Sequence, residues 1–383
     1  MIARVLVAGG GTGGHVFPSL ATATALRAAR PDLEVEFVGT GRGLEARLVP
    51  EHGWTLHEVE ALPFARRLSP QTLRVPLALL RASGVLARLI RDRGVVAALC
   101  FGGYVSMPLA LAARRTRIPL VVHEQNAVPG LANRLAARWA AVVALSVDTE
   151  EARAGLGPTV VVTGNPARPG LGDVDRAALR AEALAVFDLD PSRRTLLVFG
   201  GSQGALRINQ AIVASAGRWQ APERLQILHS AGWVGHDMTA AQWEAALHEH
   251  PRLRVRCLGF IDRMDLAYAA ADLVLCRAGA SSIAELMVMG LPSILVPYPH
   301  ATADHQTANA RALARAGAAM LIPDGQLDAE ALAASAEPLL RDEAASARMA
   351  SAARGMGRAD AADTLARLVL DVIAGAQPGE EAP

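Results

Sequence analysis

Short apolar runs alternate with longer helical patterns along most of the chain. In the first half, the runs that predict buried strands are Val5–Ala8, Val35–Val38, Thr55–Val59, Val95–Phe101, Leu120–His123, Val142–Ser146 and Val160–Thr163. Helical periodicity begins between them near Val16, Gly43, Pro76, Val105 and Gly130. This alternation predicts a parallel sheet with helices on both faces, which is a doubly wound α/β domain.

The second half of the chain repeats the pattern. After a helix expected over Asp175–Phe187, the predicted strands are Thr195–Phe199, Leu225–His229, Val255–Leu258, Leu273–Cys276, Ser293–Val296 and Met320–Ile322. The Pro- and Gly-rich segment from Gly164 to Gly170 separates the halves and predicts a linker. We therefore expect a first domain over residues 1–164, a second over 165–357, and a loose polar tail over 377–383.

Each half opens on a strand that runs into glycines and then a helix. The first such loop is Gly9-Gly10-Gly11-Thr12-Gly13-Gly14-His15, and the second is Gly200-Gly201-Ser202-Gln203-Gly204. This order places backbone N–H groups and the positive end of a helix dipole where an anion can bind. We expect the two loops to face one cleft between the domains.

Several functional classes are excluded by the sequence. Gly9, Gly11 and Gly14 satisfy the dinucleotide fingerprint, but the next strand ends in Val38-Gly39-Thr40-Gly41 and lacks the acidic residue that holds a nicotinamide ribose. All 38 basic Lys or Arg residues are arginine, so no Walker, Schiff-base or pyridoxal-phosphate lysine exists. Nor does the chain contain a zinc motif or a disulfide framework.

Charge is distributed unevenly along the chain. Residues 1–166 carry 18 Arg and 12 acidic residues, a balance of +6, whereas residues 167–383 carry 20 Arg and 25 acidic residues, a balance of −5. This difference is either chance variation between domains or a sign that the first domain faces an anionic surface. The first strand follows the N-terminus at once and no apolar run is long enough to span a bilayer, so we expect a cytoplasmic protein.

Three stretches carry candidate chemistry. His15 sits where the first glycine loop becomes a helix, and a histidine there is a usable base. His123-Glu124-Gln125-Asn126 follows a strand, so we expect these polar side chains at the ligand-binding edge of the sheet. Between Cys276 and Glu285, a strand leads through Gly279 into Ala280-Ser281-Ser282, whose N–H groups can bind a diphosphate while Glu285 accepts the ribose hydroxyls. A capping box formed by Ser282 and Glu285 is the alternative reading.

Together these stretches resemble the UDP-N-acetylglucosamine transferases of peptidoglycan synthesis, the MurG family. The resemblance extends from Val5 to about Ile373 and rests on the motifs GGGTGGHVFP, FGGYVS, HEQNAVPG, GNPAR, GGSQGA, GFID, RAGASSIAE and DHQTANA. Ala278, Ser281 and Leu44 stand where many members have Ser, Leu or Met. The resemblance implies the two-domain GT-B fold and a final helix, within residues 358–376, that packs back on the first domain.

The resemblance also implies an activity and a set of site residues. The family moves N-acetylglucosamine from UDP to the muramoyl 4-hydroxyl of undecaprenyl-pyrophosphoryl-muramoyl-pentapeptide (lipid I), with inversion at the anomeric carbon. Uridine is implied at Ile261 and Glu285, and donor phosphates or sugar near Ser202, Ala280, Ser281, Ser282 and Gln306. Further donor contacts are implied at Thr12, Gly13, Gly14, Asn126 and Arg168.

The residues themselves agree with this chemistry. No carboxylate triad or His cluster in the sequence offers a metal site, so we expect helix N-termini and Arg to stabilise the leaving UDP, with no cofactor and no nucleic-acid partner. We expect His15 to be the base or to position it, with Glu124 as the second candidate. A UDP-sugar 2-epimerase and a sugar-nucleotide-binding regulator stay open as alternatives, although the polar stretch ending at Asn126 favours an enzyme with an acceptor.

A predicted helix that carries Arg74, Arg81, Arg88 and Ile90 offers the candidate membrane surface. Arg74, Arg81 and Arg88 are spaced seven apart and share one side, while Leu79, Leu86 and Ile90 share another, and Leu77, Leu80 and Val85 extend the apolar surface. Arg66, Arg67, Arg91 and Arg93 flank it. Either the leucines face the core, or the helix presses leucines into the membrane interface with its arginines on anionic headgroups. The second reading predicts a peripheral protein on the cytoplasmic face of the inner membrane.

Overall fold

The computed structural model describes residues 2–60, 75–157, 159–201 and 203–375. The chain divides into unit 1, which comprises Met1–Pro169 and Arg358–Pro383, and unit 2, which comprises Gly170–Gly357. The sequence predicts the domain boundary at residue 164. In the structure, unit 1 instead continues to Pro169, through most of the Pro- and Gly-rich segment. The tail expected over residues 377–383 lies outside the described residues.

Unit 1 is built on a seven-stranded sheet of order β3-β2-β1-β4-β5-β6-β7, in which every paired strand is parallel. Its strands are β1 (Arg4–Ala8), β2 (Glu34–Gly39), β3 (Thr55–Glu58), β4 (Val95–Cys100), β5 (Leu120–Glu124), β6 (Val142–Leu145) and β7 (Val160–Val162). The central strands are apolar on both faces because helices cover both faces. All seven predicted strands of this half are confirmed, each within a residue or two of its predicted bounds.

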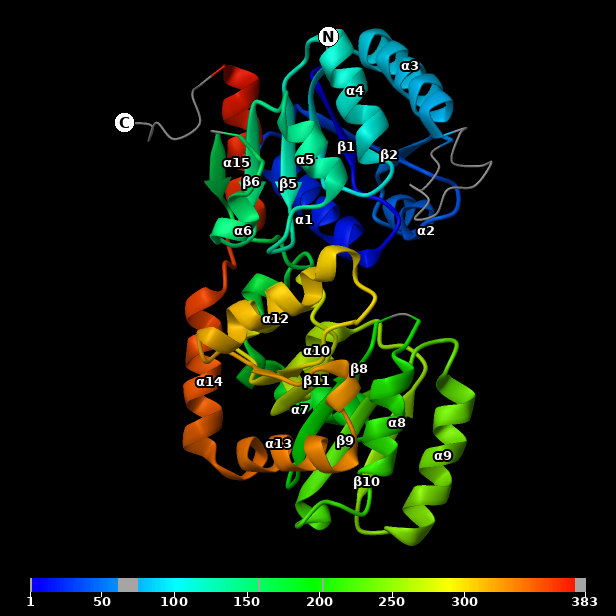
Figure 1. Cartoon of the computed structure of the whole chain (residues 1–383), viewed down its shortest axis with the longest axis vertical. Helices are drawn as coiled ribbons and strands as arrows, with labels where there is room; N and C mark the ends of the chain where they lie inside the picture. The colour runs from blue at the N-terminus through cyan, green and yellow to red at the C-terminus, as the bar shows by residue number, and fades with distance from the viewer. Residues whose placement is uncertain (1, 61–74, 158, 202, 376–383) are drawn as a thin grey trace. The chain divides into compact units, whose positions relative to one another are not determined.

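Helices of unit 1 pack on both faces of this sheet (Figure 1). They are α1 (Gly13–Ala29), α2 (Leu44–Glu51), α3 (Val75–Arg93), α4 (Ser106–Thr116), α5 (Leu131–Ala137), α6 (Glu150–Arg153) and α15 (Ala361–Ala374). Val5 and Val7 of β1 join a core cluster with α1, α2 and α15, whereas Leu6 and Ala8 join a second cluster with α3, α4 and α5. The last helix of the chain, drawn in red, therefore belongs to the core of unit 1.

Unit 2 contains a six-stranded sheet of order β10-β9-β8-β11-β12-β13, also parallel throughout. Its strands are β8 (Arg194–Phe199), β9 (Leu225–Ser230), β10 (Arg254–Leu258), β11 (Leu273–Cys276), β12 (Ser293–Leu295) and β13 (Met320–Leu321). Its helices are α7 (Arg176–Val186), α8 (Leu206–Ala214), α9 (His236–Glu249), α10 (Met264–Ala270), α11 (Ala280–Met289), α12 (His305–Arg315), α13 (Ala329–Arg341) and α14 (Glu343–Met356). Short 3-10 helices lie at Leu171–Asp173, Pro222–Arg224, Thr302–Asp304 and Asp324–Gln326.

Both sheets have the strand order of a Rossmann-like fold, and the expected pair of doubly wound α/β domains is confirmed. In unit 2, α8, α9 and α13 share a core cluster with β8, while α10 packs on α7 and α11 packs on α14. Asp175 begins α7 because its carboxylate accepts hydrogen bonds from the N–H groups of Ala177 and Ala178. Among the helices that the structure describes, none is both long and apolar enough to cross a bilayer.

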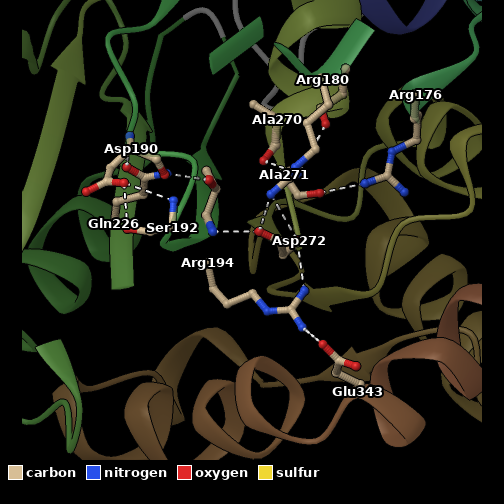
Figure 2. Close-up of polar contacts among 12 residues, drawn as sticks. Arg176, Arg180, Asp190, Ser192, Arg194, Gln226, Ala270, Ala271, Asp272 and Glu343 are labelled. Carbon is tan, nitrogen blue, oxygen red and sulfur yellow. Dashed lines mark hydrogen bonds and ion pairs between the residues drawn. The ribbon is translucent and has the colours of Figure 1, made fainter. Parts of the chain in front are cut away.

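A polar network closes the amino-terminal edge of the unit 2 sheet (Figure 2). The Asp272 carboxylate accepts hydrogen bonds from the guanidinium groups of Arg180 at 3.0 Å and Arg194 at 3.2 Å, and from the N–H of Thr195 at 2.7 Å. Arg194 also pairs with Glu343 at the start of α14. This edge is held by side-chain contacts, whereas the glycine-rich loops lie at the opposite, carboxyl-terminal edge.

Candidate active site

The strand order in unit 1 reverses beside β1, where β1 pairs with both β2 and β4. Loops that leave adjacent strands in opposite directions open a crevice at the carboxyl ends of the strands, and α/β proteins bind ligands there. The loop after β1 carries the glycines and His15, and the loop after β4 carries Gly102 and Gly103. The sequence-predicted residues of the first domain gather around this point.

His15 lies on the first turn of α1, and its two ring nitrogens have different surroundings. Its Nδ1 atom is 3.1 Å from the Oγ1 atom of Thr12, the residue that precedes the helix. Its Nε2 atom faces Gly102, because a Cβ atom placed on Gly102 would lie 3.3 Å from it. Gly102 has a φ of 92°, so glycine is favoured there, and a side chain at this position would press on the Nε2 side of the imidazole.

The glycine loop itself is less open than the sequence indicates. The N–H of Gly11, expected to be available to an anion, donates a 2.8 Å hydrogen bond to Oε2 of Glu45 on α2. The N–H groups of Gly13 and Gly14 belong to the first turn of α1, where a helix has no internal acceptor for them. An anion at this loop would therefore meet the start of α1 rather than the Gly11 amide.

The polar stretch after β5 is turned inward. His123 is fully buried; its Nε2 lies 2.9 Å from the Gly164 carbonyl oxygen, and its Nδ1 lies 3.0 Å from Nε2 of Gln125. Burial lowers the pKa of His123 from 6.5 to about 4, so the imidazole is neutral. The stretch lies at the carboxyl end of β5, as the sequence predicts, but the structure buries His123, Glu124 and Gln125 there.

Glu124 is 1% exposed and fully hydrogen-bonded. Its Oε1 accepts from the N–H of Asn126 at 3.0 Å and from Nδ2 of the same residue at 3.2 Å. Its Oε2 accepts from the N–H of Gly130 at 3.0 Å and from Nδ2 of Asn133 at 2.8 Å. The carboxylate shapes the loop that carries Asn126, and Asn133 connects it to Gly102, whose vacant Cβ position lies 3.3 Å from Asn133 Nδ2.

Arg168 lies near the first helix as well. Its guanidinium stacks on the ring of Phe17 with 4.1 Å between its carbon and the ring centroid. Because Phe17 is on α1, Arg168 is held close to the helix that carries His15. Thr12, Gly13, Gly14, Asn126 and Arg168 thus all lie on or next to the loops around His15.

In unit 2 the strand order reverses beside β8, and α11 begins directly after β11. Gly279 precedes the helix in an extended conformation without a side-chain cap, and Ala280, Ser281 and Ser282 form its first turn. The capping-box alternative is wrong, because Ser282 lies inside the helix rather than before it. The Oγ atom of Ser281 is buried and has no hydrogen-bond partner in the described part of the chain.

Glu285 follows one turn later and is 2% exposed. The hydroxyl of Tyr268, on α10, donates a 2.7 Å hydrogen bond to its Oε2 atom. Ile261 precedes α10 and is buried. The residues implied to hold uridine therefore lie on the loop before α10 and on α11, and Tyr268 links these two helices.

Gln306 is tied to the same region through α12. Its Oε1 accepts a 2.9 Å hydrogen bond from the N–H of Tyr298, and Asn309, one turn further, donates from Nδ2 to the Ala278 carbonyl at 3.2 Å. Arg277, delivered by β11, does not project toward the start of α11: its guanidinium donates to the Val296 and Pro297 carbonyls and to Asp324 at 2.5 Å. Ser202 lies outside the described residues.

Among the residues that the structure describes, no group of three or more His, Cys, Asp or Glu side chains could hold a metal ion. Sequence reasoning missed Glu45, Tyr104, Asn133 and Tyr268. For Glu45 the sequence offers one signal, the nearby glycines Gly39 and Gly43, which allow a side chain to approach the backbone closely.

Comparison with known families identifies the chain. Its residues 5–145 match the N-terminal domain of glycosyltransferase family 28, and residues 195–365 match the C-terminal domain of the same family. The chain belongs to glycosyltransferase family 28. The first match covers β1 to β6 of unit 1, and the second covers all six strands of unit 2 and the beginning of α15.

Family 28 relatives match over nearly their full length. The chain is 46% identical over 373 residues to the UDP-N-acetylglucosamine–N-acetylmuramyl-(pentapeptide) pyrophosphoryl-undecaprenol N-acetylglucosamine transferase of Nocardioides sp., covering 96% of this chain and 98% of the relative. The Streptomyces coelicolor enzyme of the same name is 42% identical, with 97% and 98% covered. The resemblance to the MurG family is thereby confirmed.

Solved structures agree with this assignment. The crystal structure of Acinetobacter baumannii MurG has a TM-score of 0.77 and 30% identity, and the match covers 97% of this chain and 100% of that one. A Listeria monocytogenes structure described as a putative UDP-N-acetylglucosamine 2-epimerase has a TM-score of 0.71 at 17% identity, with 99% of each chain covered. The second likeness shows the fold alone, and the GT-B architecture expected from the sequence is confirmed.

Proposed function

We propose that this family 28 enzyme transfers N-acetylglucosamine from UDP-N-acetylglucosamine to the muramoyl 4-hydroxyl of lipid I, with inversion at the anomeric carbon. The observation that carries the proposal is the start of α11, where the Ser281 hydroxyl, which has no hydrogen-bond partner among the described residues, lies one turn before the buried Glu285 carboxylate. The N–H groups of a first helical turn bind phosphate, and a carboxylate one turn later can accept the two ribose hydroxyls. The chain is 42–46% identical, over nearly its full length, to proteins named as N-acetylglucosamine transferases that act on a pyrophosphoryl-undecaprenol acceptor, which supports the same substrates here.

The transfer is a single displacement in which His15 acts as general base. Its Nε2 takes the proton of the acceptor hydroxyl while that oxygen forms a bond to the anomeric carbon and the bond from this carbon to the diphosphate oxygen breaks. For Nε2 to accept a proton, Nδ1 must carry the hydrogen and donate it to Thr12 Oγ1. The charge that develops on the leaving UDP is stabilised by the N–H groups at the start of α11.

Glu124 serves a different purpose in this proposal. Four N–H groups already occupy its two oxygens, so a proton from the acceptor would have to displace one of them. We assign to Glu124 the positioning of Asn126, which with Thr12, Gly13, Gly14 and Arg168 contacts the substrates. The remaining residues of the proposed donor site belong to unit 2. They are Ile261, Ala280, Ser282, Gln306 and Ser202.

We further propose that α3 is the surface that meets the membrane on its cytoplasmic side. Leu86 and Ile90 are buried in the core, as the core-facing reading of this helix expects. Leu77, Leu80 and Val85 are instead the exposed apolar residues of the helix, each more than half exposed. Exposed Arg81 and Arg88 lie on the same helix, which is the composition of an interfacial helix on anionic lipid. Arg66, Arg67 and Arg74 lie outside the described residues.

A test of the activity is UDP release from UDP-N-acetylglucosamine, measured with and without a short-chain lipid I analogue. We expect release only with the acceptor, together with a disaccharide product. A 2-epimerase would instead convert the donor without any acceptor, and a binding regulator would release no UDP. Either of those two results would contradict the proposed function.

A further inference from the structure

Glu45 is a buried carboxylate that has no part in the activity described so far. It lies on α2 and is 1% exposed, yet no Arg or His among the described residues forms an ion pair with it. Three N–H or O–H groups satisfy it instead: Oε2 accepts from the Gly11 N–H at 2.8 Å, and Oε1 accepts from the Thr40 N–H at 3.1 Å and the Thr40 hydroxyl at 3.0 Å. A buried charge held this way fixes the groups that surround it.

Glycines from three segments leave room for this carboxylate. A Cβ atom on Gly10 would lie 2.8 Å from Cδ of Glu45, and one on Gly39 would lie 2.5 Å from Cγ. A Cβ atom on Gly43 would overlap Oε2. Gly10 of the first glycine loop is therefore required by an internal anion, and Glu45 occupies the position at the Gly11 amide that a ligand anion would otherwise take.

Contacts continue from Glu45 to the residues around the base. Gly11, fixed by its hydrogen bond to Glu45 at a φ of 95°, directly precedes Thr12, whose Oγ1 is 3.1 Å from Nδ1 of His15. On the other side, the Thr40 hydroxyl lies 3.3 Å from the Tyr104 hydroxyl, and a Cβ atom on Gly11 would lie 3.1 Å from the Tyr104 ring. Glu45 thus joins the loop after β1 to the loop after β2, and the Thr40 hydroxyl continues the contact to Tyr104, which follows β4.

We propose that Glu45 is a positioning residue for the transfer reaction: it acts through Gly11 and Thr12 to hold the His15 imidazole in its working orientation. The inference rests on the proposed role of His15. The loop is then already in place before substrate binds, because an internal carboxylate rather than the substrate diphosphate holds the Gly11 amide.

The first test is Glu45→Gln. Its amide NH2 group cannot accept a hydrogen bond, so the contact with either the Gly11 N–H or the Thr40 N–H must be lost, whereas the Thr40 hydroxyl can turn and accept from the NH2 group. We expect kcat to fall roughly 10- to 100-fold, the size expected for a misplaced catalytic group, with KM for UDP-N-acetylglucosamine and the Kd for UDP within about twofold of the parent. Glu51→Gln, at the exposed end of the same helix, is the matched control and should leave kcat unchanged.

A double variant shows whether Glu45 acts through His15. In a His15→Ala background, Glu45→Gln should lower kcat by no more than about threefold further, because two residues that serve one function are not additive. If the fold-losses of kcat from the two substitutions multiply in the double variant, the inference is overturned. It is also overturned if Glu45→Gln alone has the kcat of the parent protein. If Glu45→Gln does not fold, Thr40→Ala is the substitute, because it removes one hydrogen-bond donor to the carboxylate. We expect it to lower kcat less than Glu45→Gln would, again without a change in UDP affinity.

A measurement without substrate separates this inference from the proposed function. Nitrogen NMR of 15N-histidine-labelled protein reports the tautomer of His15. Glu45→Gln should change the His15 signals and Glu51→Gln should not. If the His15 signals are unchanged in Glu45→Gln, the positioning role is overturned, even where the parent protein is active. If the signals change but the parent protein transfers no sugar, the positioning role stands and only the proposed reaction is refuted.

Discussion

The hydroxyl of Tyr268 donates a 2.7 Å hydrogen bond to the carboxylate of Glu285, and both side chains are almost completely buried. Tyr268 comes from α10 and Glu285 from α11, so the contact spans two helices of unit 2 at the proposed ribose site. It holds the carboxylate in one orientation before any ligand arrives.

Glu285→Ala should weaken UDP binding by about 1.5–3 kcal/mol, the range for a lost charge-assisted hydrogen bond, which is roughly a 10- to 150-fold rise in Kd. Tyr268→Phe keeps the carboxylate and removes one hydrogen bond to it, so the loss of UDP binding should be about 0.5–1.5 kcal/mol. Isothermal titration calorimetry with UDP measures both. Glu330→Ala, an exposed carboxylate on α13, is the control, and a parental Kd for Glu285→Ala would contradict the ribose assignment.

His15→Ala should lower turnover roughly a hundredfold or more while UDP binding survives, because general-base assistance has about that size. Thr12→Val removes the group that accepts the Nδ1 hydrogen and should also slow turnover, whereas Thr12→Ser, which keeps a hydroxyl, should restore most of it. Steady-state kinetics with the lipid I analogue measures all three. Near-normal turnover in His15→Ala would move the base elsewhere.

Reversing the charges of Arg81 and Arg88 to Glu should release the protein from anionic vesicles, because each arginine near such a surface contributes on the order of 1 kcal/mol. Adding Arg74→Glu should complete the release. Vesicle sedimentation measures binding, which should also weaken as salt increases. The same reversal at Arg218 and Arg224 of unit 2 is the control, and turnover of an acceptor without the long lipid should persist. Sedimentation equal to the parent would place the membrane surface elsewhere.

Acid should destabilise both units through a buried neutral histidine in each. His229 lies between the Trp243 indole N–H, which donates to its Nδ1 at 3.0 Å, and Asn209 Oδ1, 3.1 Å from its Nε2. Burial lowers the pKa of both His123 and His229 from 6.5 to about 4. Below pH 6.5 the unfolded chain takes up a proton that the folded chain refuses, so the free energy of unfolding falls as the pH falls from 6.5 toward 4.

Between pH 6.5 and 5 each histidine should lower the free energy of unfolding by about 1.5 kcal/mol. Urea unfolding at these two pH values measures the loss. His229→Gln should reduce the pH dependence of the unit 2 transition, while His248→Gln, an exposed histidine on α9, should leave it unchanged. If His229→Gln has the same pH dependence as the parent, protonation of His229 on unfolding is not the cause of the acid destabilisation.

Asp272→Ala should lower the free energy of unfolding by about 1–3 kcal/mol, because it leaves Arg180 and Arg194 without their shared, partly buried partner. Thermal unfolding measures the change. UDP affinity should stay at the parental value, since this network lies at the amino-terminal edge of the sheet. A large loss of UDP binding in a folded Asp272→Ala protein would contradict the separation of the two edges.

The strands could be read from the sequence because a parallel sheet buries both faces and leaves continuous apolar runs such as Leu273–Cys276. Side-chain direction at the strand ends could not be read in the same way. Glu124 looks like a ligand-facing carboxylate in sequence, yet its burial depends on Asn133 and Gly130, which approach it only after the next helix has packed.

Glu45 shows a second limit. Its partners Gly11 and Thr40 come from separate loops, and no spacing rule in the sequence connects them. The start of α11 was located correctly, but Ser282 could not be distinguished from a helix cap until the chain was seen to enter the helix at Ala280. Motif chemistry was therefore easier to predict than the orientation of the individual groups within each motif.

The position of α15 has a consequence for synthesis on the ribosome. Leu365, Val369 and Val372 complete the core that contains Val5 and Val7, but they are translated more than 350 residues after them. Unit 2 is one continuous segment and can finish folding as soon as Gly357 has left the exit tunnel. The amino-terminal half, although made first, must wait with an unfinished core until α15 has been made, so a chain truncated before α15 should expose this half to proteases and leave unit 2 resistant.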